Sequence, residues 1–392
     1  MALIFGSWFY DIVAFLAFCA VGLHLYIQHI YSYWEKRNVK FAKPIFPFGN
    51  LKNAVVLKQT FQEIFTDLYY STSEKILGVY TTTKPALLVR DPELLRFILI
   101  KDFQYFHDRG VYSNEATDPL SGHLFSINGE KWRNLRSKIT PTFTSGKLKG
   151  MFTTVLDSGR SLEEFLSQHL DKEIEMRDLM ARYATNVIAS VAFGLDVDSI
   201  KDPTATFRIM GKQFFDPNLR NLLRFACLFM LPHFGRMFRV KSVDKNYEDF
   251  IFSMVRETMN YREKNNVQRK DFMQLLLQLK NTGKVGSDDN WNIQSTGNNA
   301  TTLTFTELAA QAHVFFLAGF ETSSTTISFF LYEIAKHPDI QAKVQAEIDE
   351  VIKKHNGEIT YEALMEMKYL ESCIDESLTF ASPTMCICTY EL

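Results

Sequence analysis

The longest helical pattern in the chain begins at Thr304 and ends where His337 meets Pro338, more than 30 residues later. It contains no proline, and a helix of this length spans roughly 50 Å at 1.5 Å per residue. Thr304 and Glu307 have the spacing of a capping box at its start. The residue before a proline is disfavoured in the helical region, which predicts where the helix ends. A chain built around such an element is predicted to be mainly helical.

The rest of the chain follows this pattern with two exceptions. Asp91-Pro92-Glu93 predicts a helix start, because Asp is a good N-cap, Pro suits the first turn and Glu suits the positive end of the helix dipole. Residues 76–89 predict a short β-hairpin. Residues 281–302 are rich in Gly, Ser, Asp, Asn and Thr, which predicts an exposed, mobile loop. Helical spacing covers residues 53–72, 91–280, 339–354 and 361–378.

The expected fold class is therefore mainly α with a small β-sheet. The sequence shows no strand–helix alternation and no Gly-x-Gly-x-x-Gly, which argues against a Rossmann-type dehydrogenase. The formal net charge of −2 and the absence of a dense basic run argue against nucleic-acid binding. The five cysteines are odd in number and irregularly spaced, so they imply no disulfide framework. Zinc is not indicated, because Cys386 and Cys388 have no second ligand pair nearby.

The N-terminal segment is predicted to be an uncleaved membrane anchor. From Ile12 to Trp34 the chain carries no formally charged residue, and a spanning helix needs ~20 mainly apolar residues. Four basic residues follow, which by the positive-inside rule places everything downstream in the cytosol. A cleaved signal peptide is the alternative, but no basic region precedes the apolar run and no small-x-small site follows it. The basic residues are Lys36, Arg37, Lys40 and Lys43.

The most informative stretch is residues 315–323, inside the long helix. Ala318, Gly319 and Thr322 share a face, whereas Glu321 is rotated by ~100°. Glycine inside a helix costs ~1 kcal/mol relative to alanine, so it usually marks a close approach. One interpretation is a flat ligand against the small residues, with the threonine hydroxyl facing an atom bound on it. The other is a buried helix whose glycine permits tight packing and whose threonine bonds to the Ala318 carbonyl.

A second candidate is the pair Trp132 and Arg136. The two residues are four apart, so an indole N–H donor and a guanidinium lie on one helix face. Such a pair suits a buried carboxylate. The alternative is a stacked Trp–Arg pair at the surface.

In this order the motifs resemble those of the cytochrome P450 superfamily, the haem-thiolate monooxygenases. They are most similar to the insect microsomal group related to vertebrate drug-metabolising forms. The resemblance runs from the anchor to about Leu378. The matching sequences are Asp108 to Tyr112, Gly129 to Thr144, Asp271 to Leu276, Ala318 to Thr322 and Met367 to Leu370.

The resemblance implies a haem b cofactor and a set of residues that hold it. Trp132 and Arg136 correspond to the pair that binds a haem propionate, and Arg109 corresponds to a further propionate or pocket contact. Ala318 and Gly319 correspond to the oxygen-binding groove.

The resemblance also implies a reaction and its partners. Thr322 and Glu321 correspond to the proton-delivery pair, while the cysteine thiolate of the family favours O–O cleavage. Such enzymes insert one oxygen atom from O₂ into hydrophobic small molecules, xenobiotic or lipid-like, with NADPH electrons from NADPH–cytochrome P450 reductase. The Phe- and Met-rich residues 207–238 fall where the family has its substrate roof, with helix core as the alternative. The reductase-docking face would include Lys131, Arg133 and Lys138.

The chain departs from the family pattern near its end. Glu376 belongs to a Glu-x-x-Arg motif, but Thr379 stands where the arginine is expected. No Phe-x-x-Gly-x-Arg-x-Cys-x-Gly haem loop occurs, so no axial cysteine and no metal ligand are assigned. We interpret the chain as a P450 fold incomplete at its C-terminus and inactive as written. A frameshift, retained intron or incomplete gene model after Leu378 would explain this, as would a selected short isoform.

These expectations define an organisation and two competing functions. The predicted parts are an anchor (1–34), a basic, proline-rich linker (35–50), a partial catalytic domain (51–378) and an unrelated tail (379–392). The expected location is the endoplasmic reticulum membrane, with the catalytic domain facing the cytosol. The alternative to a monooxygenase is a non-catalytic, membrane-anchored isoform that binds reductase or lipid. A helical scaffold with chance motifs is a third interpretation.

Overall fold

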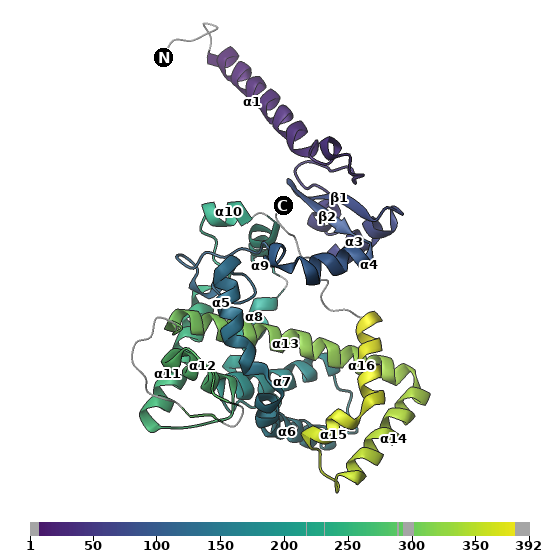
Figure 1. The fold of residues 1–392 in the computed structure, drawn as a ribbon, viewed down its shortest axis with the longest axis vertical. Coiled ribbons are helices and arrows are strands. Elements are labelled where there is room, and N and C mark those ends of the chain that lie inside the picture. Colours follow the sequence, from purple (N-terminus) through teal and green to yellow (C-terminus); the bar gives the residue numbers. More distant parts are fainter. Residues whose placement is uncertain (1–7, 217, 231, 288–289, 293–301, 381–392) are drawn as a thin grey trace. The chain divides into compact units, whose positions relative to one another are not determined.

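The computed structural model describes residues 8–216, 218–230, 232–287, 290–292 and 302–380 (Figure 1). The described residues divide into two compact units, residues 8–110 and the described residues from 111 to 380. Over the described ranges the protein is mainly helical and carries a two-stranded antiparallel sheet. The predicted fold class is confirmed.

The N-terminal unit begins with α1 (Trp8–Tyr31). Its length and mean hydropathy of 1.8 are sufficient to cross a bilayer, and no part of that window is buried against the protein. By the same two measures α13 (Phe305–Lys336) also qualifies, but several of its residues are fully buried in the core of the second unit. The remaining helices of the first unit are α2 (Lys52–Val55), α3 (Phe61–Tyr70) and α4 (Pro92–Arg96).

The predicted hairpin is present. Strand β1 (Ile76–Thr81) pairs antiparallel with β2 (Lys84–Val89). The segment predicted as a linker is held against this hairpin, because the Asn50 side chain accepts a 2.7 Å hydrogen bond from the Tyr80 amide. The predicted helix start at Asp91 is also confirmed: its carboxylate accepts a 2.9 Å bond from the Leu94 amide.

The second unit is helical, and Figure 1 shows α13 as the long green helix that crosses it. Thr304 accepts from the Glu307 amide at 3.2 Å and its own amide donates to the Glu307 carboxylate at 2.9 Å, so the predicted capping box is confirmed. The helix ends before Pro338 as predicted. Its neighbours are α5 (Gly129–Ile139), α6 (Ser145–Ser167), α7 (Met176–Ile188), α8 (Thr206–Phe215), α9 (Leu219–Phe225), α10 (Pro232–Met237), α11 (Lys245–Asn265), α12 (Phe272–Thr282), α14 (Pro338–Lys354), α15 (Tyr361–Glu366) and α16 (Lys368–Phe380).

Short turns connect these elements. The 3₁₀ turns are Glu35–Arg37, Phe103–Tyr105, Pro119–Ser121 and Thr140–Phe143, and the π turns are Phe97–Lys101, Ala189–Phe193 and Ala226–Met230.

The prediction of one exposed loop over residues 281–302 is wrong for part of that segment. Trp291 is 7% exposed, and its carbonyl accepts a 2.7 Å bond from the Gln274 side chain. The fully buried Lys147 donates to the carbonyls of Ser287 and Asn290 at 2.7 and 2.9 Å. Side chains from other helices therefore satisfy the backbone of a segment whose own composition is that of a loop.

The helix predicted over 361–378 is divided into α15 and α16 at Met367. The Glu347 carboxylate of α14 accepts bonds from the amides of Tyr369 and Leu370, each 2.8 Å long. An acidic group at a helix N-terminus satisfies free N–H donors and interacts favourably with the dipole. A residue from another helix thus fixes a boundary that local spacing does not show.

Candidate active site

Helix α5 carries the predicted Trp132 and Arg136. Glu130 lies in its first turn and Arg136 with Lys138 in its last, which suits the helix dipole. Trp132 is 8% exposed and belongs to the core, while Arg136 is exposed. Among the residues that the structure describes, the Arg136 guanidinium forms no ion pair. The Arg136 guanidinium is therefore available to an acidic group of a bound ligand.

Helix α13 brings a small-residue face to the surface of the unit. Ala318 and Thr322 are exposed, whereas most of the helix from Leu308 to Phe316 is buried in the core. Gly319 lies against α7, and a Cβ placed on it would be 2.6 Å from Ile188 Cδ1. The missing side chain thus permits close packing of α7 and α13, as in the packing interpretation of this glycine.

The two predicted proton-delivery residues point to different partners. Thr322 donates its hydroxyl proton to the Ala318 carbonyl at 2.5 Å, as in the second interpretation of the stretch. Glu321 is partly buried, and its carboxylate lies 3.5 Å from the exposed guanidinium of Arg177 on α7. Their roles in proton delivery stay a prediction.

Helices α5 and α13 are joined through an aromatic contact. The ring of Phe143, in the turn after α5, lies 5.3 Å from the ring of Phe315, one turn before Gly319. The exposed small-residue face and the unneutralised Arg136 therefore belong to neighbouring elements of one unit. This combination fits a flat, apolar group that bears carboxylates, and haem is such a group. Arg109 lies in the N-terminal unit, so its part in that site stays a prediction.

A cavity of about 140 Å³ lies above α13 in the same unit. Its lining joins the segment 111–126, the end of α8, the α9 region and α13. Of the stretch 207–238, Phe214, Phe225 and Phe229 line this cavity, whereas Phe207 is 4% exposed and packs in the core. The core interpretation therefore holds for Phe207, and a substrate-roof role for the cavity-lining residues stays a prediction.

Two histidines that line this cavity were not predicted from the sequence. His313 lies on α13, and His123 lies on the segment before α5, with the ring centroids 5.8 Å apart. Gln311 holds that segment on the helix, since its side chain accepts from the Leu124 amide at 2.9 Å and donates to the Gly122 carbonyl at 3.3 Å. The available signal was two polar residues, Gln311 and His313, within an apolar run of the long helix.

Burial shifts the titration of both imidazoles. It lowers the pKa of His123 from 6.5 to about 4. Burial, and to a smaller extent the neighbouring His123, holds the pKa of His313 well below 6.5. Both rings are therefore neutral near pH 7.

These shifts predict an acid-sensitive fold. Between pH 6.5 and 5 the unfolded chain binds protons on both imidazoles that the folded chain does not bind, so stability falls as pH falls. For His123 and His313 together, the expected loss in the free energy of unfolding is about 2 kcal/mol. It is measured as the urea unfolding free energy at pH 7 and pH 5. The combined variant His123→Leu, His313→Phe, Tyr247→Phe should show a smaller loss; an equal loss would contradict this origin.

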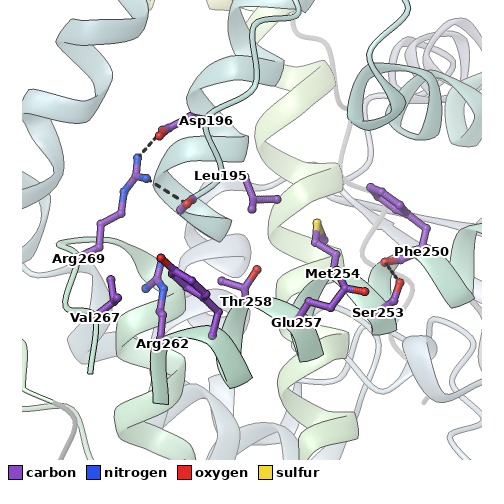
Figure 2. Close-up of a pocket in the computed structure, with 12 residues that line it drawn as sticks. Leu195, Asp196, Phe250, Ser253, Met254, Glu257, Thr258, Arg262, Val267 and Arg269 are labelled. Carbon is purple, nitrogen blue, oxygen red and sulfur yellow. Dashed lines mark hydrogen bonds and ion pairs between the residues drawn. The ribbon is translucent and has the colours of Figure 1, made fainter. Parts of the chain in front are cut away.

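A larger cavity, of about 630 Å³, lies between α11 and residues 194–196 (Figure 2). Arg269 donates to the Gly194 carbonyl at 3.0 Å and to Asp196 at 3.2 Å at its edge. None of the predicted site residues lines it. Its size alone therefore does not associate it with the candidate chemistry.

The described part of the chain offers no metal site of its own. Within the described ranges, no group of three or more His, Cys, Asp or Glu side chains is placed to hold a metal ion. Cys227 and Cys373 are half-buried and Cys19 is exposed. The predictions that concern Cys386, Cys388 and the tail beyond Phe380 fall outside the described residues.

Comparison with known proteins assigns the class. The family model described as Cytochrome P450 matches residues 39–387, a range that continues past Leu378. The chain belongs to the cytochrome P450 family, whose members are haem-dependent monooxygenases.

Within that family the chain is similar to insect proteins. It is 41% identical over 360 residues to the Drosophila melanogaster protein named "Probable cytochrome P450 6d5", covering 91% of this chain and 71% of that protein. Cytochrome P450 6d3 of Musca domestica is 39% identical over 375 residues, with 91% and 71% covered. Cytochrome P450 6A1 of Musca domestica is 39% identical over 379 residues, with 95% and 72% covered. The expected insect type of the family is confirmed.

Proposed function

We propose that this protein is a monooxygenase of hydrophobic small molecules that takes NADPH electrons from a membrane-bound reductase. The observation that carries this proposal is the exposed small-residue face of α13 together with the Arg136 guanidinium of the same unit, which has no ion-pair partner among the described residues. When bound, haem supplies the oxygen-activating chemistry, and the protein supplies placement and electrostatics.

Two elements would hold the cofactor. Arg136 would neutralise a propionate by a charge-assisted, forked hydrogen bond, with Trp132 beside it on the same helix face. The exposed Ala318 leaves room for a flat group, because it carries no side chain beyond Cβ, and Gly319 would let α13 pack closely on α7 beneath it. Arg109 would be a further contact.

Two residues would manage protons. The Thr322 hydroxyl can hold a proton on Oγ1 and accept another bond with its lone pairs. Glu321 sits at the edge of the protein, where the exposed Arg177 stabilises its carboxylate and water can reach it. The pair would move protons from solvent to the small-residue face.

The N-terminal unit and the surface charge support a proposed location and partner. We propose that α1 anchors the protein in the endoplasmic reticulum membrane, with the helical unit in the cytosol. The reductase would dock near Arg133 and Lys138. Lys131 contributes less of its charge, because it pairs with Glu115 at 2.6 Å and Glu307 at 3.6 Å.

We further propose that the 392-residue polypeptide, expressed by itself, does not form thiolate-ligated haem, because no haem-loop sequence occurs in it. The test compares it with a chimera in which the residues after Leu378 are replaced by the corresponding segment of cytochrome P450 6A1. The reduced carbon-monoxide spectrum of the chimera should show the thiolate band, and that of the 392-residue chain should not.

The control is the chimera with its grafted haem-loop cysteine changed to alanine, which should lose the band. A thiolate band from the 392-residue chain would contradict the proposed inactivity. A folded chimera without any haem absorption would contradict the proposed cofactor site.

A further inference from the structure

The cavity above α13 contains two neutral imidazoles whose hydrogen-bonding capacity is only half used. Tyr247 on α11 contacts His313 Nδ1 at 3.1 Å, and Ser126 contacts His123 Nδ1 at 3.3 Å. Among the described residues, neither Nε2 atom has a hydrogen-bond partner. Both rings line the cavity, so each Nε2 atom is available to a ligand bound there.

The contacts at Nδ1 determine which Nε2 carries a proton. The Ser126 hydroxyl donates its hydrogen bond to the Ser121 carbonyl, so towards His123 it accepts a hydrogen bond from the Nδ1–H group. A neutral His123 then presents a bare Nε2, which is an acceptor.

The reverse holds for His313. The buried Tyr247 phenol has His313 Nδ1 as its described hydrogen-bond partner, so its proton is satisfied only if it donates to that nitrogen. A neutral His313 then carries its proton on Nε2, which is a donor. The cavity thus combines one donor and one acceptor on rings whose centroids are 5.8 Å apart.

Much of the rest of the lining is apolar, although the buried hydroxyls of Tyr112 and Ser242 also lie in it without a hydrogen-bond partner among the described residues. Phe125, Phe214, Leu228 and Leu317 supply apolar surface. Arg224 also lines the cavity, but its guanidinium is ion-paired with Asp244 and bonded to Asn221. A volume of about 140 Å³ is close to that which holds one six-membered carbon ring.

We propose that His123 and His313 recognise a hydroxyl group on an apolar, ring-sized substrate or on one ring of a larger substrate. The hydroxyl oxygen accepts from His313 Nε2 and its proton is donated to His123 Nε2. A ketone satisfies only the donor and a hydrocarbon satisfies neither. This inference rests on the proposed function for its biological meaning, but ligand binding in this cavity does not require haem.

The test is ligand titration of the full chain in detergent, with ¹⁵N-labelled histidine followed by NMR. The probes are cyclohexanol, cyclohexanone and methylcyclohexane, which replace a hydroxyl by a carbonyl or a methyl group. Cyclohexanol should bind about tenfold more tightly than methylcyclohexane, with cyclohexanone between them, since each hydrogen bond contributes a modest factor. The His123 and His313 signals should shift on binding the alcohol.

Variants assign the effect to the two rings. His123→Leu, and His313→Phe combined with Tyr247→Phe so that no phenol is left unpaired, should each bring the alcohol and hydrocarbon affinities within about twofold of each other. The control His169→Leu alters a histidine that stacks on Phe165 and does not line the cavity, so it should keep the tenfold preference.

Three results would overturn the proposal. They are equal affinity for the three probes, a preference that persists in both variants, and tighter binding of cyclohexanecarboxylate, which would assign recognition to Arg224. Absence of any saturable binding would overturn it as well. The carbon-monoxide spectrum of the chimera tests the proposed function separately, so the two failures are distinguishable.

Discussion

Replacing Arg262 by alanine is expected to lower the free energy of unfolding by about 3 to 5 kcal/mol, because it leaves a buried carboxylate without its main partner. Arg262 and Asp271 are 3% and 0% exposed. They form a forked pair with bonds of 2.7 and 2.6 Å, and the Gln274 amide donates to the same carboxylate at 2.9 Å. Burial raises the pKa of Asp271 even with Arg262 opposing it, so the uncompensated charge is costly.

The measurement is urea unfolding of the solubilised chain, followed by the fluorescence of the buried Trp132 and Trp291. The double variant Arg262→Met, Asp271→Leu should recover to within about 2 kcal/mol of the parent, because it removes the unpaired charge and loses only the N-cap bond from the Gln274 amide. As a control, Arg160→Ala removes an exposed pair with Asp157 and should change stability by about 0.5 kcal/mol or less. A loss for Arg262→Ala as small as this control would refute the expectation.

Gly194 provides a second test of the same pair. Its φ is +67°, and a Cβ there would lie 2.5 Å from Asp271 Oδ2 and against Arg262 Nη2. Gly194→Ala should therefore disturb the ion pair in the parent. In the Arg262→Met, Asp271→Leu background it should cost only the left-handed backbone conformation, about 1 to 2 kcal/mol.

The second large effect concerns Thr322. In the haem-loaded chimera, Thr322→Ala should lower product formation about 100-fold at unchanged haem content, which is the usual size of a lost general acid–base contribution. The physical reason is that alanine removes the hydroxyl from the small-residue face without changing the helix. Product formation and haem content are measured on the same preparation.

Two further variants separate proton delivery from packing. Thr322→Ser keeps the hydroxyl and should retain most activity. As a control, Ser323→Ala removes the hydroxyl of the exposed neighbour, which is rotated by ~100° around the helix, and should leave the rate of product formation unchanged. If Thr322→Ala kept the parent rate, the hydroxyl would serve only its bond to the Ala318 carbonyl.

What the sequence predicted well depends on neighbours in the chain. The capping box of Thr304 and Glu307, the helix start at Asp91 and the hairpin of residues 76–89 are each determined within a few residues. The boundary at Met367 depends on Glu347 of another helix, and the backbone of Trp291 depends on Gln274. Because these contacts join residues far apart in the chain, no local sequence pattern indicates the boundary at Met367 or the burial of Trp291.

The same distinction applies to the candidate site. Trp132, Arg136 and residues 318–322 have motif spacing that the sequence shows directly, and their roles toward the cofactor stay a prediction. His123 and His313 lie 190 residues apart in sequence and meet only in the folded unit. Their joint donor–acceptor character depends on Ser126 and Tyr247, which no motif identifies.

The amide of Gln311 has a consequence for how this protein can diversify. It fastens the 122–124 segment to α13 through the backbone, not through the side chains of that segment. Inherited substitutions at His123 or Phe125 can therefore reshape the cavity while the attachment persists. A substitution of Gln311 would remove both hydrogen bonds that hold residues 122–124 against α13. Substitutions of the cavity-lining side chains at residues 122–125 can therefore change which compounds bind, whereas Gln311 must be kept to hold this segment in place.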